Sequence, residues 1–286
     1  MARLWRAFSS ALQVSGKSVL LVYLLLWAIV SAPLLMTDIP PMLDYPNHIS
    51  RIHILTHLDD PAYAEIYRSN WKFLPNLMFE AVAIPLSHLM PVKVAGKVYV
   101  ALYLLALPLG VLFLHFGIYR RLSLLPALSF LFVYHEAFMY GFLGFCLSLA
   151  LAFAAVAIWI LIRAAPLWAR FLSGALMSAI LVTSHLYALG VYGLAVGVVE
   201  LYRFLTKKPR TQASIQHFAV SALQFVPTLG AFSLLYLGGG NFSGEFAFPT
   251  LGVKMQNVSN VINARNSVYN ALPFLPLSAL AAIYAV

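Results

Sequence analysis

The sequence predicts an all-α, polytopic helical membrane protein. Of its 286 residues, 62% are hydrophobic and only 9% are charged, whereas a soluble domain carries about 25% charged residues. The mean hydropathy is +0.86. Long uncharged runs recur, and they are continuously apolar, whereas the strands of a membrane barrel would alternate. We therefore expect about 8 transmembrane spans in a single domain that covers residues 1–286.

The charge and the cysteine content exclude several kinds of partner and site. The formal net charge is +9, but the basic residues cluster between apolar runs, as they do in the cytoplasmic loops of membrane proteins. This distribution argues against nucleic acid as a partner. The single cysteine, Cys146, lies inside an apolar run, which leaves no internal disulfide and no cysteine-based metal site.

The first element is the uncharged run 18–36, which follows Arg3, Arg6 and Lys17. It is long enough to cross the hydrocarbon core. A signal peptide is the rival interpretation, but its apolar core would be shorter, and Pro33 directly follows the small-residue site that would have to be cleaved. We expect a retained span with the N-terminus inside.

The next element is a first outer loop, 37–93, whose segment 37–60 is the most polar run of the first hundred residues. We expect short surface helices in it. The apolar segment 77–90 is short and is interrupted by Glu80 and Pro85. If this segment does not cross, most of the 18 Lys and Arg residues lie inside, as the positive-inside rule prefers. We therefore predict a re-entrant or interfacial segment.

The other apolar runs predict seven further spans and a second large outer loop, 238–270. The last run has no basic residue after it and ends on Val286, so we expect a chain that is truncated at its C-terminus. The predicted spans are 94–116, 122–140, 142–162, 167–185, 187–205, 215–237 and 271–286.

The first candidate for chemistry is Asp44, in the run Leu43-Asp44-Tyr45-Pro46. Asp44 could cap a helix, because aspartate accepts a backbone N–H there and proline suits the first turn. It could also act as a general base at the water–membrane boundary. The two interpretations are compatible, since a cap also fixes the direction of the carboxylate.

His48 and Arg51 follow Asp44 and are three residues apart, which places them on one side of a short helix. The planar fork of arginine suits phosphate. The alternative is a surface helix with solvated charges. His53 and His57 fall on a different side and are better explained by that alternative.

His135 and Glu136 form the next ionisable pair, near the outer end of the predicted span 122–140. The pair lacks the second histidine of a zinc-protease motif. Ionisable groups at membrane depth are functional candidates, and the alternative is a satisfied hydrogen bond between helices.

His185 lies at the end of an apolar run, where a lone histidine is more often structural. A divalent-metal site is possible in principle, although no ligand spacing demands one. Its ligands would come from Asp44, His48, His135, Glu136 and His185.

The arrangement of the N-terminal part resembles that of the GT-C superfamily of integral-membrane glycosyltransferases. A span from the inside is followed at once by an outer loop that opens with an acidic residue, by surface helices and by a proline-containing apolar segment. The run Asp44-Tyr45-Pro46-Asn47-His48, with Arg51, looks like the first-loop motif of uncharacterised bacterial membrane proteins related to that superfamily. The resemblance covers mainly residues 1–120.

The resemblance implies a polyprenyl-phosphate-linked sugar donor, an inverting transfer and a location in the bacterial inner membrane. Asp44 would be the general base, and Arg51 or a metal would supply the cation near the lipid-phosphate leaving group. His48, His135, Glu136 and His185 would bind substrate. Many such enzymes carry two neighbouring acidic residues at the loop start, whereas here Asp38 precedes Asp44 by several positions.

Two other functions stay open at this point. One is a transporter or flippase for a lipid-linked or small polar substrate, which would place polar groups near the bilayer midplane on interrupted helices, often in paired repeats. The other is a non-catalytic membrane subunit that docks a partner through the outer loops. The ionisable residues here gather at one face and no repeat is evident, which favours the enzyme.

Overall fold

The computed structural model describes residues 15–69, 75–206, 212–237, 250 and 252, and every regular element in these residues is a helix. The elements are α2 (Gly16–Ser31), η1 (Ala32–Leu35), α3 (Tyr45–Leu55), α4 (Pro61–Ala64), α5 (Met78–Ser87), α6 (Val92–Tyr119), η2 (Leu125–Phe132), α7 (Glu136–Met139), α8 (Leu143–Leu161), η3 (Ile162–Ala164), α9 (Leu167–Ser184), α10 (Leu186–Thr206), α11 (Gln212–Leu223) and α12 (Val226–Leu237).

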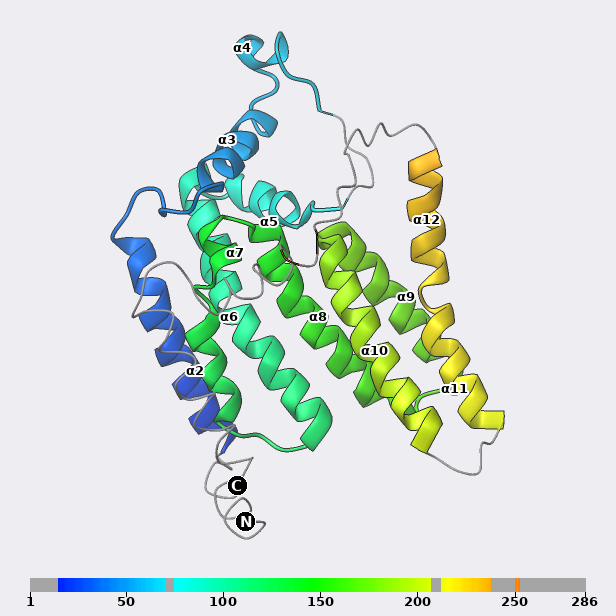
Figure 1. Ribbon diagram of the computed structural model, residues 1–286. Coiled ribbons are helices and arrows are strands. Elements are labelled where there is room, and N and C mark those ends of the chain that lie inside the picture. Colours follow the sequence, from blue (N-terminus) through cyan, green and yellow to red (C-terminus); the bar gives the residue numbers. More distant parts are fainter. Residues whose placement is uncertain (1–14, 70–74, 207–211, 238–249, 251, 253–286) are drawn as a thin grey trace.

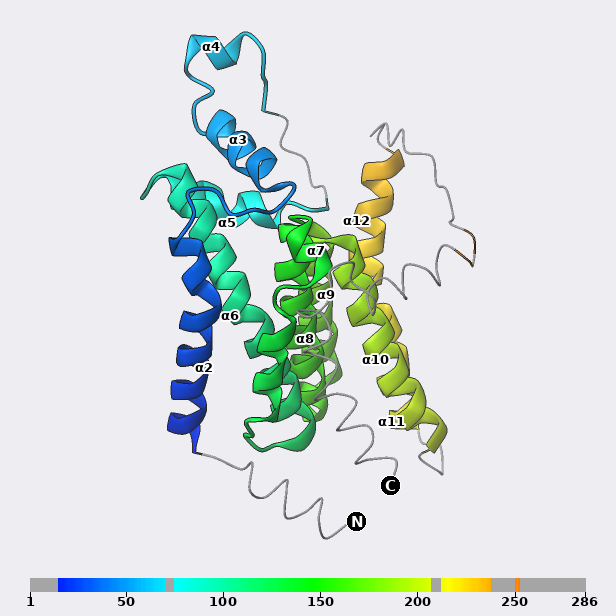
Figure 2. The same cartoon turned by 60° about the vertical axis from the view of Figure 1, so that its left-hand side comes forward.

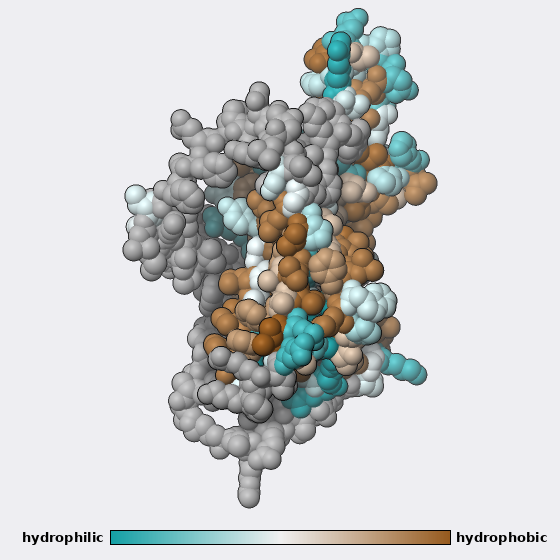
Figure 3. Space-filling view, turned by 90° about the vertical axis from the view of Figure 1, so that its right-hand side faces the viewer, coloured by the Kyte–Doolittle hydropathy of each residue, from teal (hydrophilic) through white to brown (hydrophobic). Residues whose placement is uncertain are grey.

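Five helices of the described part are long and apolar enough to cross a membrane, which confirms the predicted all-α membrane class. They correspond to the predicted spans 18–36, 94–116, 142–162, 167–185 and 187–205. The helices of the bundle run side by side (Figure 1), and hydrophobic residues predominate in the middle of the coloured part of the face in Figure 3. The observed bounds of these spans are Gly16–Leu35, Val92–Tyr119, Leu143–Ala164, Leu167–Ser184 and Leu186–Thr206.

The polar first loop lies at one end of this bundle. The first span ends and α6 begins at the same end, where α3 and α4 project beyond the long helices (Figure 1). The short helix α5 lies across the direction of the long helices at this end (Figure 2). Its 10 residues would extend only about 15 Å, half the thickness of the hydrocarbon core.

The predicted span 122–140 is not a long α-helix. It consists of η2, an 8-residue 3₁₀ helix, followed by the single turn α7, and it returns the chain from the end of α6 to the start of α8 (Figure 1). Hydrogen bonds tie this segment to its neighbours: the Tyr103 hydroxyl of α6 donates to Val133 O at 2.9 Å, and the Tyr134 hydroxyl donates to Val30 O of α2. Such partners make irregular backbone tolerable inside a membrane protein.

The predicted span 215–237 is divided into α11 and α12. The division falls just before Pro227, which lacks the N–H that a continuous helix would need there. The predicted span 271–286 and nearly all of the predicted loop 238–270 lie outside the described residues.

Helices α6 and α8 pack closely against each other in the core. At Gly110 an added Cβ would lie 2.6 Å from Ala150 O, and at Gly117 it would lie 3.2 Å from Ala157 Cα. The α6 backbone therefore approaches α8 more closely than any larger residue would allow. About three turns further toward the polar end, the buried Tyr99 hydroxyl donates to Leu143 O at 3.1 Å and ties α6 to the start of α8.

This packing predicts the effect of a single methyl group. Gly110→Ala should lower the free energy of unfolding by about 1–3 kcal/mol, because the new Cβ meets backbone that cannot turn aside. Gly197→Ala on α10 is the matched control, since an added Cβ there has nothing within 4 Å, and it should leave stability equal or raised. Thermal unfolding of the purified protein in detergent measures both, and equal stability of the two variants would contradict the packing.

Candidate functional site

A cavity of about 680 Å³ opens at the polar end of the bundle. Its walls come from α3, from the segment before α5, from the start of α8 and from the junction of α9 and α10. Four of the six predicted site residues line it: Asp44, His48, Arg51 and His185. The other lining residues are Asn47, Asn76, Ala137, Phe142, Leu143, Gly144, Phe145 and Tyr187.

Asp44 is held in place by its backbone. Its N–H donates to Tyr140 O at 3.0 Å, and its carbonyl accepts from His48 N at 3.1 Å. Asp44 occupies the N-cap position of α3, but its side chain makes no capping hydrogen bond, so the capping role predicted for the carboxylate is wrong. Among the described residues, the partner of the carboxylate is the Asn47 amide, which donates at 3.5 Å. A weakly bonded, half-buried carboxylate therefore lines the cavity.

Gly141 makes the close approach of the first loop possible. It has a φ of 85°, in the region that favours glycine. An added Cβ would also lie 2.8 Å from Asp44 N. Both its conformation and its neighbour therefore require a glycine at this position.

His48, Arg51 and Glu80 form a chain of polar contacts beside Asp44. His48 Nε2 lies 3.0 Å from Gly141 O, so this nitrogen carries the proton and donates it. His48 Nδ1 then accepts from Arg51 Nη2 at 3.0 Å. The same Nη2 forms an ion pair with the buried Glu80 of α5. The predicted shared face of His48 and Arg51 is confirmed.

The environment of His48 lowers its pKa. Burial is the largest cause, and the positive charge of Arg51 acts in the same direction against the weaker opposing effects of Gly141, Glu80 and Asp44. A neutral imidazole is also what the hydrogen bond from Arg51 requires, because a charged ring offers no acceptor.

His185 lies at the junction of α9 and α10, in an extended conformation between the two helices. Its Nδ1 accepts from Tyr187 N at 3.3 Å, and its ring packs edge-on against Phe145 with 5.4 Å between centroids. Burial lowers its pKa as well. His185 thus closes the side of the cavity opposite α3.

His135 and Glu136 do not line this cavity. His135 Nε2 is 3.1 Å from the Tyr103 hydroxyl, and His135 Nδ1 accepts from Phe138 N at 3.3 Å and caps α7. This is the structural alternative considered above. Glu136 is exposed on α7 and lines a separate hollow with Met42 and Tyr140. The residues that the structure describes hold no group of three or more His, Cys, Asp or Glu side chains suited to a metal ion, so the five-residue metal site considered above is not formed.

Three residues of this region were not predicted from the sequence. Asn76 has a φ of 71°, and its Oδ1 would be 2.3 Å from a Cβ at position 144, so Gly144 makes room for it. Asn47 reaches Asp44. Glu80 was noted only as an interruption of an apolar segment, although a buried carboxylate there needed a cation, and that requirement was a signal for its pairing with Arg51.

Comparison of the chain with known protein families, curated proteins and solved structures finds no match. The function is therefore argued from the cavity and from the chemistry of the residues that line it.

The state of His48 predicts a pH dependence of stability. Because the folded protein lowers this pKa below the ordinary value of 6.5, the unfolded chain binds more protons as the pH falls through 6.5. Stability present above that pH should therefore decline from about pH 7 to about pH 5. His48→Gln should show a smaller decline in thermal unfolding measured across this range, and an undiminished decline would contradict the assignment.

Proposed function

We propose that the protein is a membrane glycosyltransferase that moves a sugar from a polyprenyl-phosphate donor to an acceptor at the outer face of a bacterial inner membrane. The observation that carries the proposal is that Asp44 and Arg51 line the same cavity at the end of an apolar bundle. The resemblance of the first loop to the GT-C superfamily supports the same assignment.

The cavity suits a substrate that is part lipid. Its volume of about 680 Å³ lies within the range of about 300–1,000 Å³ that small-molecule sites occupy. Phe142 and Tyr187 line it and are exposed, as is the neighbouring Tyr140. Aromatic side chains of this kind are enriched at the membrane–water interface. A donor could therefore leave its chain in the lipid and place its phosphate and sugar in the cavity.

Asp44 is proposed as the general base of the transfer. The acceptor hydroxyl gives its proton to the Asp44 carboxylate as its oxygen forms a bond to the anomeric carbon of the sugar. The bond between that carbon and the phosphate oxygen breaks on the opposite side, and the polyprenyl phosphate leaves with the bonding electrons. This displacement inverts the anomeric centre.

Arg51 is proposed to bind the phosphate that leaves. An arginine has five N–H donors, and the contacts of Arg51 with His48 and Glu80 both come from Nη2. Within the described residues, Nη1 and Nε have no other partner. Because the Arg51 side chain is 48% exposed, these two groups are accessible for a phosphate, which the guanidinium fork fits well. The first turn of α8, at Gly144, adds backbone N–H groups that lack acceptors within the helix.

A transporter or flippase is the second candidate, and one observation favours it: α9 and α10 hold a buried ion pair between Arg170 and Glu200. Ionisable groups inside a bundle often mark a transport path. This pair, however, lies toward the end of the bundle away from the Asp44 cavity, where α9 starts and α10 ends (Figure 1). The two polar sites do not form one continuous path at the midplane, which favours the transferase.

The first prediction of this function concerns the proposed base. Asp44→Asn should lower transfer at least about 100-fold, because the amide cannot accept the acceptor proton, while the protein stays folded. Asp59→Asn in the exposed turn after α3 is the matched control and should keep wild-type activity. The assay follows release of polyprenyl phosphate from a panel of polyprenyl-phosphate hexoses by purified protein. Full activity of Asp44→Asn would remove the base assignment.

The second prediction separates the charge of Arg51 from its structural role. Arg51→Gln should weaken binding of a short-chain polyprenyl phosphate and also lower stability, because it leaves Glu80 buried without its cation. The double variant Arg51→Gln, Glu80→Gln should regain stability without regaining affinity. Binding and thermal unfolding are measured on the same samples. Wild-type affinity in the stable double variant would show that Arg51 does not hold the phosphate.

A further inference from the structure

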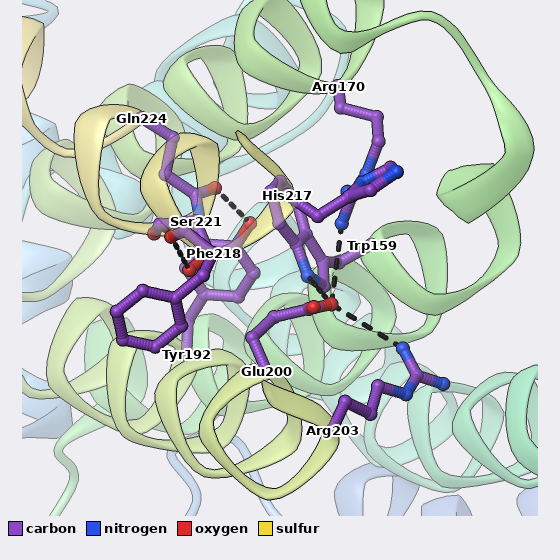
Figure 4. Close-up of polar contacts among 9 residues, drawn as sticks. All are labelled: Trp159, Arg170, Tyr192, Glu200, Arg203, His217, Phe218, Ser221 and Gln224. Carbon is purple, nitrogen blue, oxygen red and sulfur yellow. Dashed lines mark hydrogen bonds and ion pairs between the residues drawn. The ribbon is translucent and has the colours of Figure 1, made fainter. Parts of the chain in front are cut away.

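The end of the bundle away from the Asp44 cavity contains a second concentration of charge. Residues of α8, α9, α10 and α11 meet there, and the buried Glu200 of α10 lies at the centre (Figure 4). Its Oε1 accepts from Trp159 Nε1 at 3.1 Å, from Arg170 Nη2 at 3.4 Å and from Arg203 Nη1 at 3.4 Å. One carboxylate oxygen thus serves three donors, two of which are cations.

The charges in this cluster do not balance. Arg170 is fully buried and Glu200 is 3% exposed, and Arg163 lines the same small cavity as Glu200 and Arg203. His217 cannot supply a negative charge, and its ring is neutral because Nδ1 accepts a hydrogen bond from Arg170. Within the described residues, Arg170 and Arg203 therefore share the Glu200 carboxylate, and Arg163 lines the same cavity without an ion pair.

The cost of this imbalance falls on the buried Arg170, because a buried cation needs a counter-charge, whereas the Arg203 side chain is 28% exposed. Two contacts partly stabilise the buried Arg170. Its guanidinium lies 4.2 Å from the Trp159 ring centroid, and it donates a hydrogen bond to His217. Its Nε nevertheless remains buried without a hydrogen-bond partner. Neither feature compensates Arg163 or Arg203, which reach the cavity.

The cavity has the size and the lining of a small anion site. Its volume is about 190 Å³, below the range of about 300–1,000 Å³ for drug-sized ligands. A water molecule takes about 30 Å³ of the liquid, so the space suits a single phosphate-sized group. Ser214, in the first turn of the 12-residue helix α11, also lines it, and the start of a helix favours anions.

We propose that this cavity binds a phosphate group through Arg163 and Arg203, with Glu200, which also pairs with Arg170, holding Arg203 in place. The phosphate could belong to an anionic lipid headgroup or to a small soluble phosphate. Nearby Trp168 and Tyr202 are exposed on α9 and α10, as residues in contact with lipid headgroups often are. The site is separate from the Asp44 cavity and does not depend on the proposed transfer.

The test uses the purified full-length protein in an uncharged detergent. Inorganic phosphate, dihexanoyl phosphatidic acid and dihexanoyl phosphatidylcholine are titrated separately, and binding is followed by native mass spectrometry and by the shift in thermal unfolding. Arg163→Gln and Arg203→Gln should each weaken binding of the anion about tenfold or more, as expected for the loss of a hydrogen bond to a charged group. Arg121→Gln is the matched control, because Arg121 follows α6 at the same end and does not line the cavity.

Each outcome decides the proposal. Binding of phosphatidic acid that depends on both arginines, with inorganic phosphate inactive, supports a lipid headgroup, and dependent binding of inorganic phosphate supports a soluble ligand. Arg163 forms no ion pair within the described residues, so Arg163→Gln should fold even where Arg203→Gln does not. Wild-type affinity in Arg163→Gln, the absence of binding by either anion, or equal binding of phosphatidylcholine would overturn the site.

Discussion

Two main-chain hydrogen bonds determine where the first loop lies. Leu43 N donates to Met139 O at 3.1 Å, and Asp44 N donates to Tyr140 O at 3.0 Å. The acceptors belong to the C-terminal end of α7, where carbonyl groups lack partners within the helix. The donors belong to a loop that has no ladder of its own. Each segment thus satisfies the other, and Asp44 is placed at the cavity as a consequence.

This contact exists because residues 122–140 do not form one long helix. A continuous helix would use its own carbonyls internally, and the first loop would have nothing to bind. The single turn of α7 instead leaves acceptors at the level where α5 and the start of α8 meet. Tyr103 supports the arrangement from α6 by bonding to Val133 O. The departure from regular structure is therefore what creates the cavity wall.

The sequence was sufficient to predict the membrane helices that can be recognised from composition alone. Five spans were predicted because a long uncharged run has few alternatives to a membrane helix. The shared face of His48 and Arg51 followed from helical spacing. Other features depend on contacts distant in the chain. The partner of Glu80 and the separation of His135 from Asp44 were set by packing between segments, which periodicity does not encode.

The ion pair between Arg51 and Glu80 is best explained as a contact that fixes the position of the Arg51 side chain. Buried ion pairs contribute little net stability, since desolvation offsets the attraction, and Glu80 Oε2 is itself buried without a hydrogen-bond partner. A free arginine side chain would lose about 2 kcal/mol of rotamer entropy on binding a ligand. Because Glu80 and His48 hold Nη2 beforehand, much of that loss is incurred on folding, and Nη1 and Nε are preorganised for an anion. The buried carboxylate of α5 thus contributes to the cavity although it does not line it.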